Sequence, residues 1–260
     1  MYYGVSRVAF SIFGLDVYWY GLIITFAIAL AFGLSFLYNK QRCLPKDFSF
    51  DLILAIVPIG IVFARLFYCL FDASAGLQEF FNFRNGGLSI LGALIGGAIG
   101  LFILCAVKKQ NFLAVADVLV TLVLMCQAIG RWGNFFNQEV YGMVITNPAY
   151  QWFPLAVEVN GTYYMALFFY ESVLNLLGAI VLIVLLYKTK TPGICSAVYL
   201  MWYGVVRAVL EGLRQEEYIL KWGSVPISQL VSICMALAGL GLMIYWVCKV
   251  IKKKKEQIHV

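Results

Sequence analysis

Seven long apolar segments dominate this sequence and leave few folds open to it. A helix needs roughly 20 apolar residues to cross the hydrocarbon core of a bilayer, and each segment is close to that length. Because 63% of the 260 residues are hydrophobic and only 12% are charged, a water-soluble fold is excluded. We therefore expect an all-α polytopic integral membrane protein in which residues 1–260 form a single transmembrane domain. The predicted spans lie near residues 17–38, 50–71, 88–107, 112–130, 164–187, 194–213 and 226–248.

Lysine and arginine residues gather in alternate loops of this predicted topology. They follow the first, third, fifth and seventh spans, and the last group includes the run Lys252 to Lys255. Since cytoplasmic loops carry an excess of basic residues, we expect the N-terminus outside and the C-terminus in the cytoplasm. Residues 249–260 then form a basic cytoplasmic tail beside an anionic inner leaflet. We expect no nucleic-acid partner, because no basic folded domain is predicted.

The most polar stretch reads IGRWGNFFNQEVYG and follows the fourth predicted span. It places Arg131, Asn134, Asn137 and Glu139 within nine residues. Arginine offers a planar fork of donors that suits phosphate or carboxylate, and Glu139 could counter that charge, orient it or accept a proton. A polar loop that merely caps the helix explains the same composition, so the stretch alone leaves both interpretations open.

Residues 131–163 are predicted to form a small external head segment between the fourth and fifth spans. Within it, two short alternating runs flank Asn160 and Gly161. An Asn-Gly pair between such runs is typical of a tight β-hairpin.

Ionisable residues inside the predicted spans are further candidates, because each costs a few kcal/mol to insert into a membrane. Arg65 lies in the second span and Glu171 in the fifth. The sixth span carries Arg207 and Glu211, and Arg214 follows, so that the spacing places all three on one helix face. The trio could be a self-neutralising ion pair, but two arginines against one glutamate leave a positive charge that an anionic partner would complete.

The glycine-rich run GGLSILGALIGGAIG has two predicted roles. Gly92, Gly96 and Gly100 recur every four residues, which favours close packing of two helices. Gly86 and Gly87 precede the start of this helix on the predicted outer side, where free backbone N–H groups could face an anion.

Combining these candidates predicts one polar pocket near the outer leaflet, suited to a phospholipid phosphate. We expect no metal and no cofactor, because no carboxylate cluster is suited to Mg²⁺ or Ca²⁺ and the single histidine is His259 in the tail. The predicted pocket residues are Arg65, Arg131, Arg207, Asn134, Glu139 and Glu211.

The block GRWGNFFNQEVYG resembles the signature of the prolipoprotein diacylglyceryl transferases. This resemblance implies a seven-span enzyme of the bacterial plasma (inner) membrane with its active site toward the outer face. It also implies the reaction: the diacylglyceryl group of phosphatidylglycerol moves to the thiol of the lipobox cysteine of a prolipoprotein signal peptide, releasing glycerol phosphate. That is the first step of bacterial lipoprotein maturation, and the bilayer supplies the lipid. Further similarity covers WYGL at Trp19, GIVFARLFY around Arg65, NGGLSILGALIGG at Asn85, YES at Tyr170 and YGVVRAVLEGLR at Tyr203.

The resemblance also implies roles for individual residues. Arg131 becomes the main contact of the phosphate and Arg207 the second essential arginine, while Glu211 positions Arg207. Asn134, Asn137 and Glu139 orient the head group. The remaining substrate-binding candidates are Arg65, Glu171, Gly86 and Gly87.

One departure concerns the general base. Members of this family commonly carry histidine or tyrosine where this chain has Leu91, which can neither accept nor donate a proton. Glu139, Glu171, Glu211 or a tyrosine remain as alternatives. Two other functions stay open at this point: an anionic-lipid transporter or flippase, and a divergent paralogue that binds the substrates with reduced or no transferase activity.

Overall fold

The computed structural model describes residues 5–71, 78, 80–81, 87, 89–216, 219, 221–222 and 225–258. The chain divides into two compact units. The larger unit comprises residues 1–31 and 119–260, and the smaller unit comprises residues 32–118.

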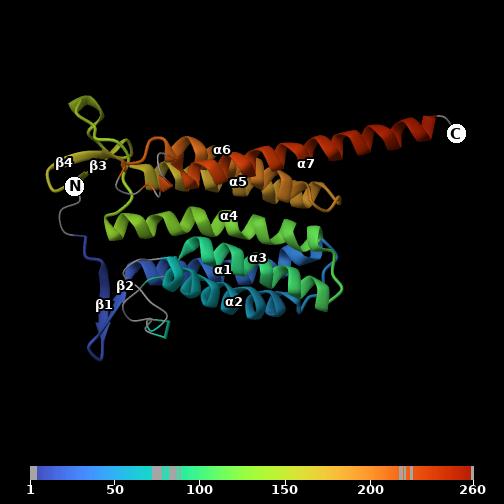
Figure 1. The fold of residues 1–260 in the computed structure, drawn as a ribbon, viewed down its shortest axis with the longest axis horizontal. Helices are drawn as coiled ribbons and strands as arrows, with labels where there is room; N and C mark the ends of the chain where they lie inside the picture. The colour runs from blue at the N-terminus through green and yellow to red at the C-terminus, as the bar shows by residue number, and fades with distance from the viewer. Residues whose placement is uncertain are drawn as a thin grey trace. The chain divides into compact units, whose positions relative to one another are not determined.

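Helices account for nearly all of the described secondary structure (Figure 1). Six are long and apolar enough to cross a membrane, and the apolar part of α3, Gly92–Val107, is shorter. Each predicted span therefore corresponds to a helix, which confirms the all-α polytopic class, while the orientation in the membrane remains a prediction. The helices are α1 (Trp19–Gln41), α2 (Phe48–Phe71), α3 (Ile90–Val107), α4 (Phe112–Asn137), α5 (Leu167–Lys188), α6 (Ile194–Glu211) and α7 (Ile227–Ile258).

In the smaller unit, α2 and α3 pack closely through the predicted glycine series. A Cβ atom on Gly92 would overlap the carbonyl oxygen of Phe63, and one on Gly96 would overlap Phe63 and Ile59. Because the backbones approach this closely only where side chains are missing, the predicted packing role of these glycines is confirmed.

Buried polar groups join other parts of the smaller unit. The Arg42 guanidinium forms an ion pair with Asp117, with Nη2 2.9 Å from Oδ2, and both side chains are buried. Nearby in sequence, Asn39 is fully buried and its Nδ2 donates a hydrogen bond of 2.9 Å to Ser49 Oγ. These groups satisfy one another inside the unit, as buried polar groups must.

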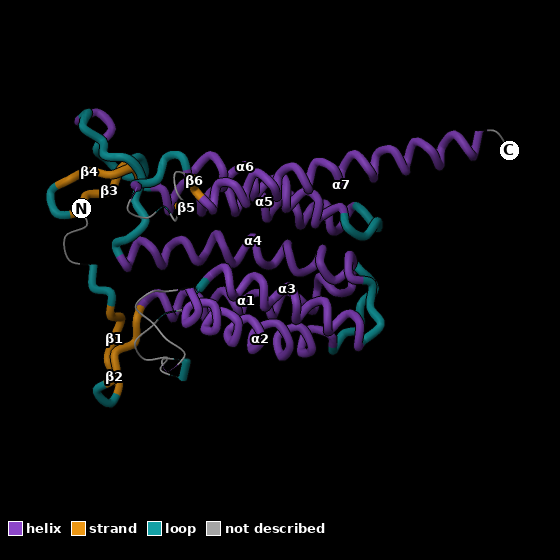
Figure 2. Tube along the Cα trace, viewed as in Figure 1, coloured by secondary structure: helices purple, strands orange, loops and turns teal. Residues whose placement is uncertain are grey.

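Short strands form antiparallel pairs outside the helices (Figure 2). In the larger unit, β3 (Ala156–Val159) pairs with β4 (Thr162–Met165) across a turn at Asn160 and Gly161, whose φ angles are 49° and 80°. These left-handed angles are those of the tight turn that the Asn-Gly pair predicts, so the hairpin is confirmed. The other pairs are β1 (Val8–Ile12) with β2 (Leu15–Tyr18), and β5 (Lys221–Trp222) with β6 (Val225–Pro226).

The hairpin covers a small apolar core. Tyr141, Val157, Ala166 and Phe168 are buried together there, and Phe135 from the end of α4 packs against them. This core fixes the end of α4 against the start of α5, where the polar residues of interest lie.

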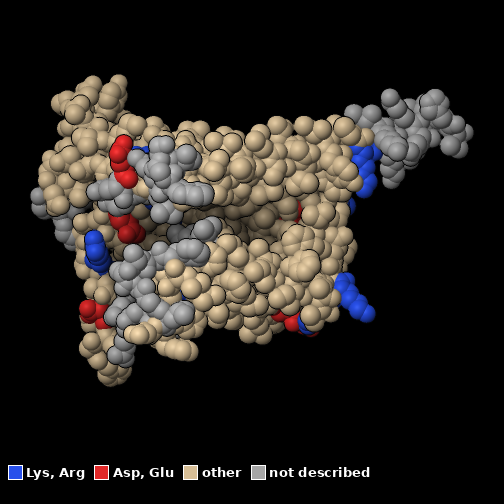
Figure 3. All heavy atoms as spheres, in the orientation of Figure 1, with Lys and Arg blue, Asp and Glu red and all other residues tan. Residues whose placement is uncertain are grey.

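Charged side chains are sparse along the helices. On the face drawn in Figure 3, blue and red atoms lie mainly near helix ends, and the surface along the helix middles is mostly uncharged. This distribution suits helices that lie in hydrocarbon.

Helix α4 differs from its prediction at its C-terminal end. It continues to Asn137, so Arg131 and Asn134 lie on its last two turns and not in a loop. The helix accommodates these polar residues because their side chains find partners on neighbouring elements.

Candidate active site

Three helices of the larger unit each contribute one charged side chain to a common cluster. Arg131 on α4 and Arg207 on α6 both contact Glu171, which lies near the start of α5. Arg131 Nη2 is 2.6 Å from Glu171 Oε1, and Arg207 Nη1 is 3.3 Å from Oε2. Glu171 is 2% exposed. A single buried carboxylate therefore holds two guanidinium groups, one through each oxygen.

The cluster continues along α6 and past its end. Glu211 Oε2 is 2.7 Å from Arg207 Nη2 and 3.3 Å from Arg214 Nη1. The predicted shared face of Arg207, Glu211 and Arg214 is thus confirmed. Within the part of the chain that the structure describes, the other carboxylate oxygen of Glu211 and the Nε of Arg214 are buried without hydrogen-bond partners.

At its other end the cluster reaches the turn that follows α4. Asn134 Oδ1 accepts a hydrogen bond of 3.3 Å from Arg131 Nη1, and its Nδ2 donates one of 3.0 Å to Glu139 Oε1. Asn137 Nδ2 donates to the same oxygen at 3.2 Å. Asn134 therefore links Glu139 to the arginines.

The backbone brings Glu139 to this position. The Glu139 N–H donates to the Asn134 carbonyl oxygen at 3.1 Å, and Gln138 takes a left-handed φ of 53°. This is the pattern with which helices commonly end. It folds the chain back over the last helical turn, so that the Glu139 carboxylate meets the side chains of Asn134 and Asn137.

The resulting row of charges from Arg131 to Arg214 alternates in sign and has one more positive than negative charge. Arg131, Arg207 and Arg214 stand against Glu171 and Glu211. Burial lowers the pKa of Arg214 below its ordinary value, and the positive charge of Arg207 lowers it further, while Glu211 opposes the change. An anion at this end of the row would relieve the repulsion between the guanidinium groups.

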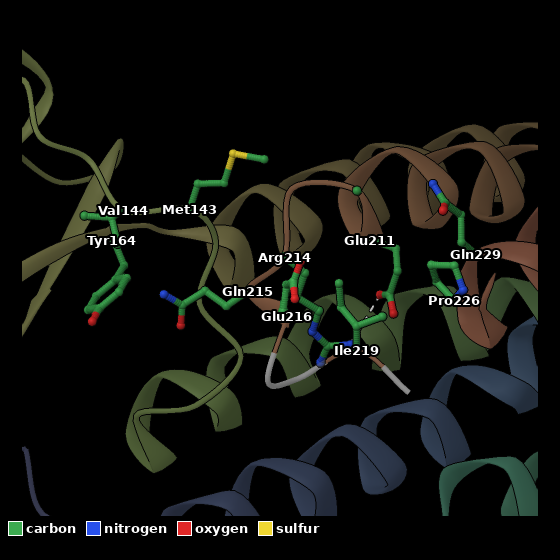
Figure 4. Close-up of a pocket in the computed structure, with 11 residues that line it drawn as sticks. Met143, Val144, Tyr164, Glu211, Arg214, Gln215, Glu216, Ile219, Pro226 and Gln229 are labelled. Atoms are coloured by element: carbon green, nitrogen blue, oxygen red, sulfur yellow. Dashed lines mark hydrogen bonds and ion pairs between the residues drawn. The ribbon is translucent and has the colours of Figure 1, made fainter. Parts of the chain in front are cut away.

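A cavity lies at each end of the row. The larger one, of about 690 Å³, is lined by Glu211 and Arg214 together with Met143, Tyr164 and Gln229 (Figure 4). A dashed line in Figure 4 joins the Glu211 carboxylate to Arg214. The second cavity, of about 410 Å³, is lined by Glu139, Asn137 and Tyr20, among others. The row of charges therefore runs from one cavity to the other within the larger unit.

Comparison with known proteins identifies the family of this chain. The family described as "Prolipoprotein diacylglyceryl transferase" matches residues 7–245. The chain belongs to this family. It is 37% identical over 259 residues to phosphatidylglycerol–prolipoprotein diacylglyceryl transferase 1 of Clostridium perfringens, covering 96% of this chain and 98% of that protein. The correspondingly named proteins of Clostridium botulinum (strain Loch Maree) and Finegoldia magna are 37% and 35% identical, each covering 97% of this chain and 100% of the relative.

In this member of the diacylglyceryl transferase family, the structure joins most of the predicted site residues in one network. Arg65 and Gly87, two other predicted site residues, lie in the smaller unit. Arg65 donates from Nη1 to the Gly87 carbonyl oxygen at 2.7 Å and from Nε to the Phe80 carbonyl oxygen at 3.2 Å. Gly87 thus offers Arg65 its carbonyl group. Gly86 lies outside the described residues, as does the side chain of Leu91. The residues that the network joins are Arg131, Asn134, Asn137, Glu139, Glu171, Arg207 and Glu211.

The sequence predicts Glu171 only as a substrate-binding residue, and Tyr20 is not among the predicted site residues. Tyr20 lies on α1 near Arg131 and Glu139 and lines the smaller cavity. Its ring packs where a side chain on Gly133 would otherwise stand. The motif WYGL that contains Tyr20 is a signal in the sequence, but helical spacing does not connect α1 with α4.

A substitution at Gly133 tests the packing of Tyr20 against α4. A Cβ atom there would overlap the Tyr20 ring, so we expect Gly133→Ala to displace Tyr20, to destabilise the protein by about 1–3 kcal/mol and to lower transfer activity. Thermal unfolding in detergent and a transfer assay measure the two effects. Gly241→Ala on α7 is the matched control, because nothing lies within 4 Å of its added Cβ. Equal behaviour of the two variants would contradict the role given to Gly133.

Proposed function

We propose that this protein transfers the diacylglyceryl group of phosphatidylglycerol to the thiol of the lipobox cysteine of prolipoproteins. Membership of the family supports the reaction, and the names of its relatives supply both substrates, the lipid and the prolipoprotein. The single observation that carries the proposal for the site is the pairing of Arg131 and Arg207 on one buried carboxylate, Glu171. We place the enzyme in a bacterial plasma membrane with this site toward the outer face.

The chemistry of the reaction makes demands that the row of charges can meet. The thiolate sulfur forms a bond to the terminal glycerol carbon of the diacylglyceryl group while the bond from that carbon to the phosphate oxygen breaks. The electron pair leaves with the phosphate, so negative charge grows on glycerol phosphate. Preorganised guanidinium donors stabilise such charge strongly in a site that excludes water. Arg131 and Arg207 are held apart on separate helices and aligned by Glu171, as this role requires.

The thiol proton needs an acceptor, and the three glutamates differ in the hydrogen bonds that their oxygens already accept. Each oxygen of Glu171 accepts from an arginine, and Oε1 of Glu139 accepts from two side-chain amides. Among the described residues, Glu211 keeps one oxygen without a partner, and it lines the larger cavity. We assign the proton to Glu211, while the neighbouring arginines favour the thiolate.

The acyl chains need an apolar surface beside the charged row. A cavity of about 390 Å³ between α1, α4 and α5 meets this need, and we assign an acyl chain to it. Trp132 and Ser172, which follow Arg131 and Glu171 directly in the chain, contribute to its wall. The other lining residues are Ile23, Ala128, Ile129, Phe136 and Leu176.

A reconstitution experiment tests the proposed reaction. The purified protein is placed in vesicles that contain phosphatidylglycerol, and a synthetic prolipoprotein peptide with a lipobox cysteine is added. We expect the mass of the peptide to rise by one diacylglyceryl group and glycerol phosphate to be released. A peptide with serine in place of the cysteine and vesicles of phosphatidylcholine alone are the controls. Movement of lipid between leaflets without a peptide adduct would instead indicate a flippase, and peptide binding without an adduct a paralogue that has lost activity.

A further inference from the structure

A second polar layer lies one helical turn from the charged cluster, toward the middle of the same three helices. Gln127, Asn175 and Tyr203 each stand four residues from the cluster member on their own helix, which are Arg131, Glu171 and Arg207. Four residues advance a helix by about 6 Å. The layer therefore belongs deeper in the hydrocarbon than the arginines.

Contacts on either side show which way Asn175 faces. One turn earlier on α5, Glu171 contacts both α4 and α6. About one turn later, a Cβ atom on Gly178 would meet Trp202 of α6 and Leu124 of α4. Asn175 lies between these two positions and is fully buried. Its side chain consequently faces the space where α4, α5 and α6 meet.

Asn175 is unusual because its amide is fully buried and unused. Within the described part of the chain, neither its Nδ2 nor its Oδ1 has a hydrogen-bond partner, and neither does Oε1 of Gln127. The Gln127 Nε2 donates to the Tyr199 hydroxyl at 3.3 Å, and the Tyr199 ring stacks on that of Tyr203. An unsatisfied buried amide destabilises a protein, and an apolar side chain of the same shape would avoid that cost.

The chemistry of the lipid explains why such a costly amide would stand at this depth. In a diacylglyceryl phospholipid, the ester carbonyls lie a few bonds from the phosphate on the side of the acyl chains. A phosphate held by Arg131 and Arg207 therefore brings these carbonyls to the level of the second layer. An ester carbonyl accepts hydrogen bonds and donates none, so its partner must be a donor, and the Asn175 Nδ2 is such a group.

We propose that Asn175, in the layer that also contains Tyr203, forms a subsite that binds an ester carbonyl of the diacylglyceryl group. The proposal rests on the proposed function and specifies its lipid substrate: the site selects a diester over a lipid whose chains are joined by ether bonds. An ether lipid offers no carbonyl to the Asn175 Nδ2, whereas a diester gives this donor an acceptor. Tyr203 lies close to Arg131 and Arg207.

The test compares two phosphatidylglycerols with identical chain lengths, one with ester and one with ether linkages, in the reconstituted transfer assay. For the unmodified protein we expect kcat/KM to be about tenfold or more higher with the diester, as the loss of one buried hydrogen bond predicts. Asn175→Leu is expected to lower transfer from the diester to the level of the ether lipid, so that the ratio approaches one. Its melting temperature is expected to stay the same or to rise, because the substitution removes an unsatisfied amide.

Asn39→Leu is the matched control. It makes the same chemical change at a fully buried helical asparagine in the smaller unit, and we expect the diester preference to persist in it. A ratio near one in the unmodified protein, or an unchanged ratio in Asn175→Leu, would overturn the subsite. So would a lower melting temperature with an equal loss on both lipids, since that result indicates a purely structural asparagine.

Equilibrium binding of the two lipids, measured by competition with a fluorescent phosphatidylglycerol, separates this proposal from the proposed reaction. A diester preference in binding without any transfer would contradict the reaction and support the subsite. Transfer with equal binding of the two lipids would support the reaction and contradict the subsite.

Discussion

Replacing Arg131 by alanine is expected to lower the rate of diacylglyceryl transfer by about 100- to 1,000-fold, as the loss of one preorganised donor to a developing anion does in other enzymes. The guanidinium of Arg131 is the link between Glu171 and the Asn134–Glu139 pair. In the proposed mechanism, its removal therefore deprives the departing phosphate of a donor, and it also disconnects the Asn134–Glu139 pair from Glu171. Transfer to the synthetic peptide in phosphatidylglycerol vesicles measures the effect.

Two further variants make the result for Arg131 specific. Arg131→Lys keeps the charge but loses the planar fork, so we expect activity between that of the alanine variant and the unmodified protein. Lys188→Ala removes an exposed positive charge from the last turn of α5, and we expect normal transfer from it. Near-normal transfer by Arg131→Ala, with Lys188→Ala equally active, would show that Arg131 does not contact the reacting phosphate.

Substituting Glu171 by glutamine is expected to have the largest effect on stability. The change leaves Arg131 and Arg207 close together without the carboxylate that both of them contact. Breaking a buried ion pair by removing one partner costs about 3–5 kcal/mol, because an uncompensated charge remains buried. We therefore expect a clearly lower melting temperature in detergent together with a large loss of transfer.

Glu158→Gln provides the comparison for Glu171. Glu158 lies on the β3–β4 hairpin, where its Oε2 accepts a hydrogen bond of 3.1 Å from the Tyr163 hydroxyl. This bond raises the pKa of Tyr163. We expect the control to change stability by no more than about 0.5 kcal/mol, as is usual for surface substitutions. If the two glutamine variants unfold at the same temperature, Glu171 does not hold the arginines in the way described.

Local patterns in the sequence predicted the features that depend on one helix or one turn. Hydrophobic length predicted the spans, the Asn-Gly pair predicted the hairpin, and helical spacing predicted the face shared by Arg207 and Glu211. The central position of Glu171 could not be predicted in this way, because it depends on three helices meeting at one level. Spacing within a helix carries no information about which residues of other helices lie at that level.

The same limit applies to Tyr20 and Asn175. Tyr20 is joined to the site through its packing on Gly133, a contact between α1 and α4. Asn175 looks like an ordinary polar residue on an apolar helix until its burial and its unused amide are known. For Arg131 and Glu139, in contrast, the dense polar motif at the end of an apolar run marks both residues as candidates in the sequence, although a helix-capping loop explains the same composition.

The carboxylates that pair with the arginines affect how strongly the site binds the substrate and the transition state. In the proposed mechanism, an arriving phosphate has to compete with Glu171 and Glu211 for the same guanidinium donors, so part of its attraction to the site is cancelled while the substrate is intact. As the bond to carbon breaks, the phosphate gains charge and competes more strongly. The paired row thus favours the transition state over the bound substrate, and this difference in affinity is what accelerates a reaction.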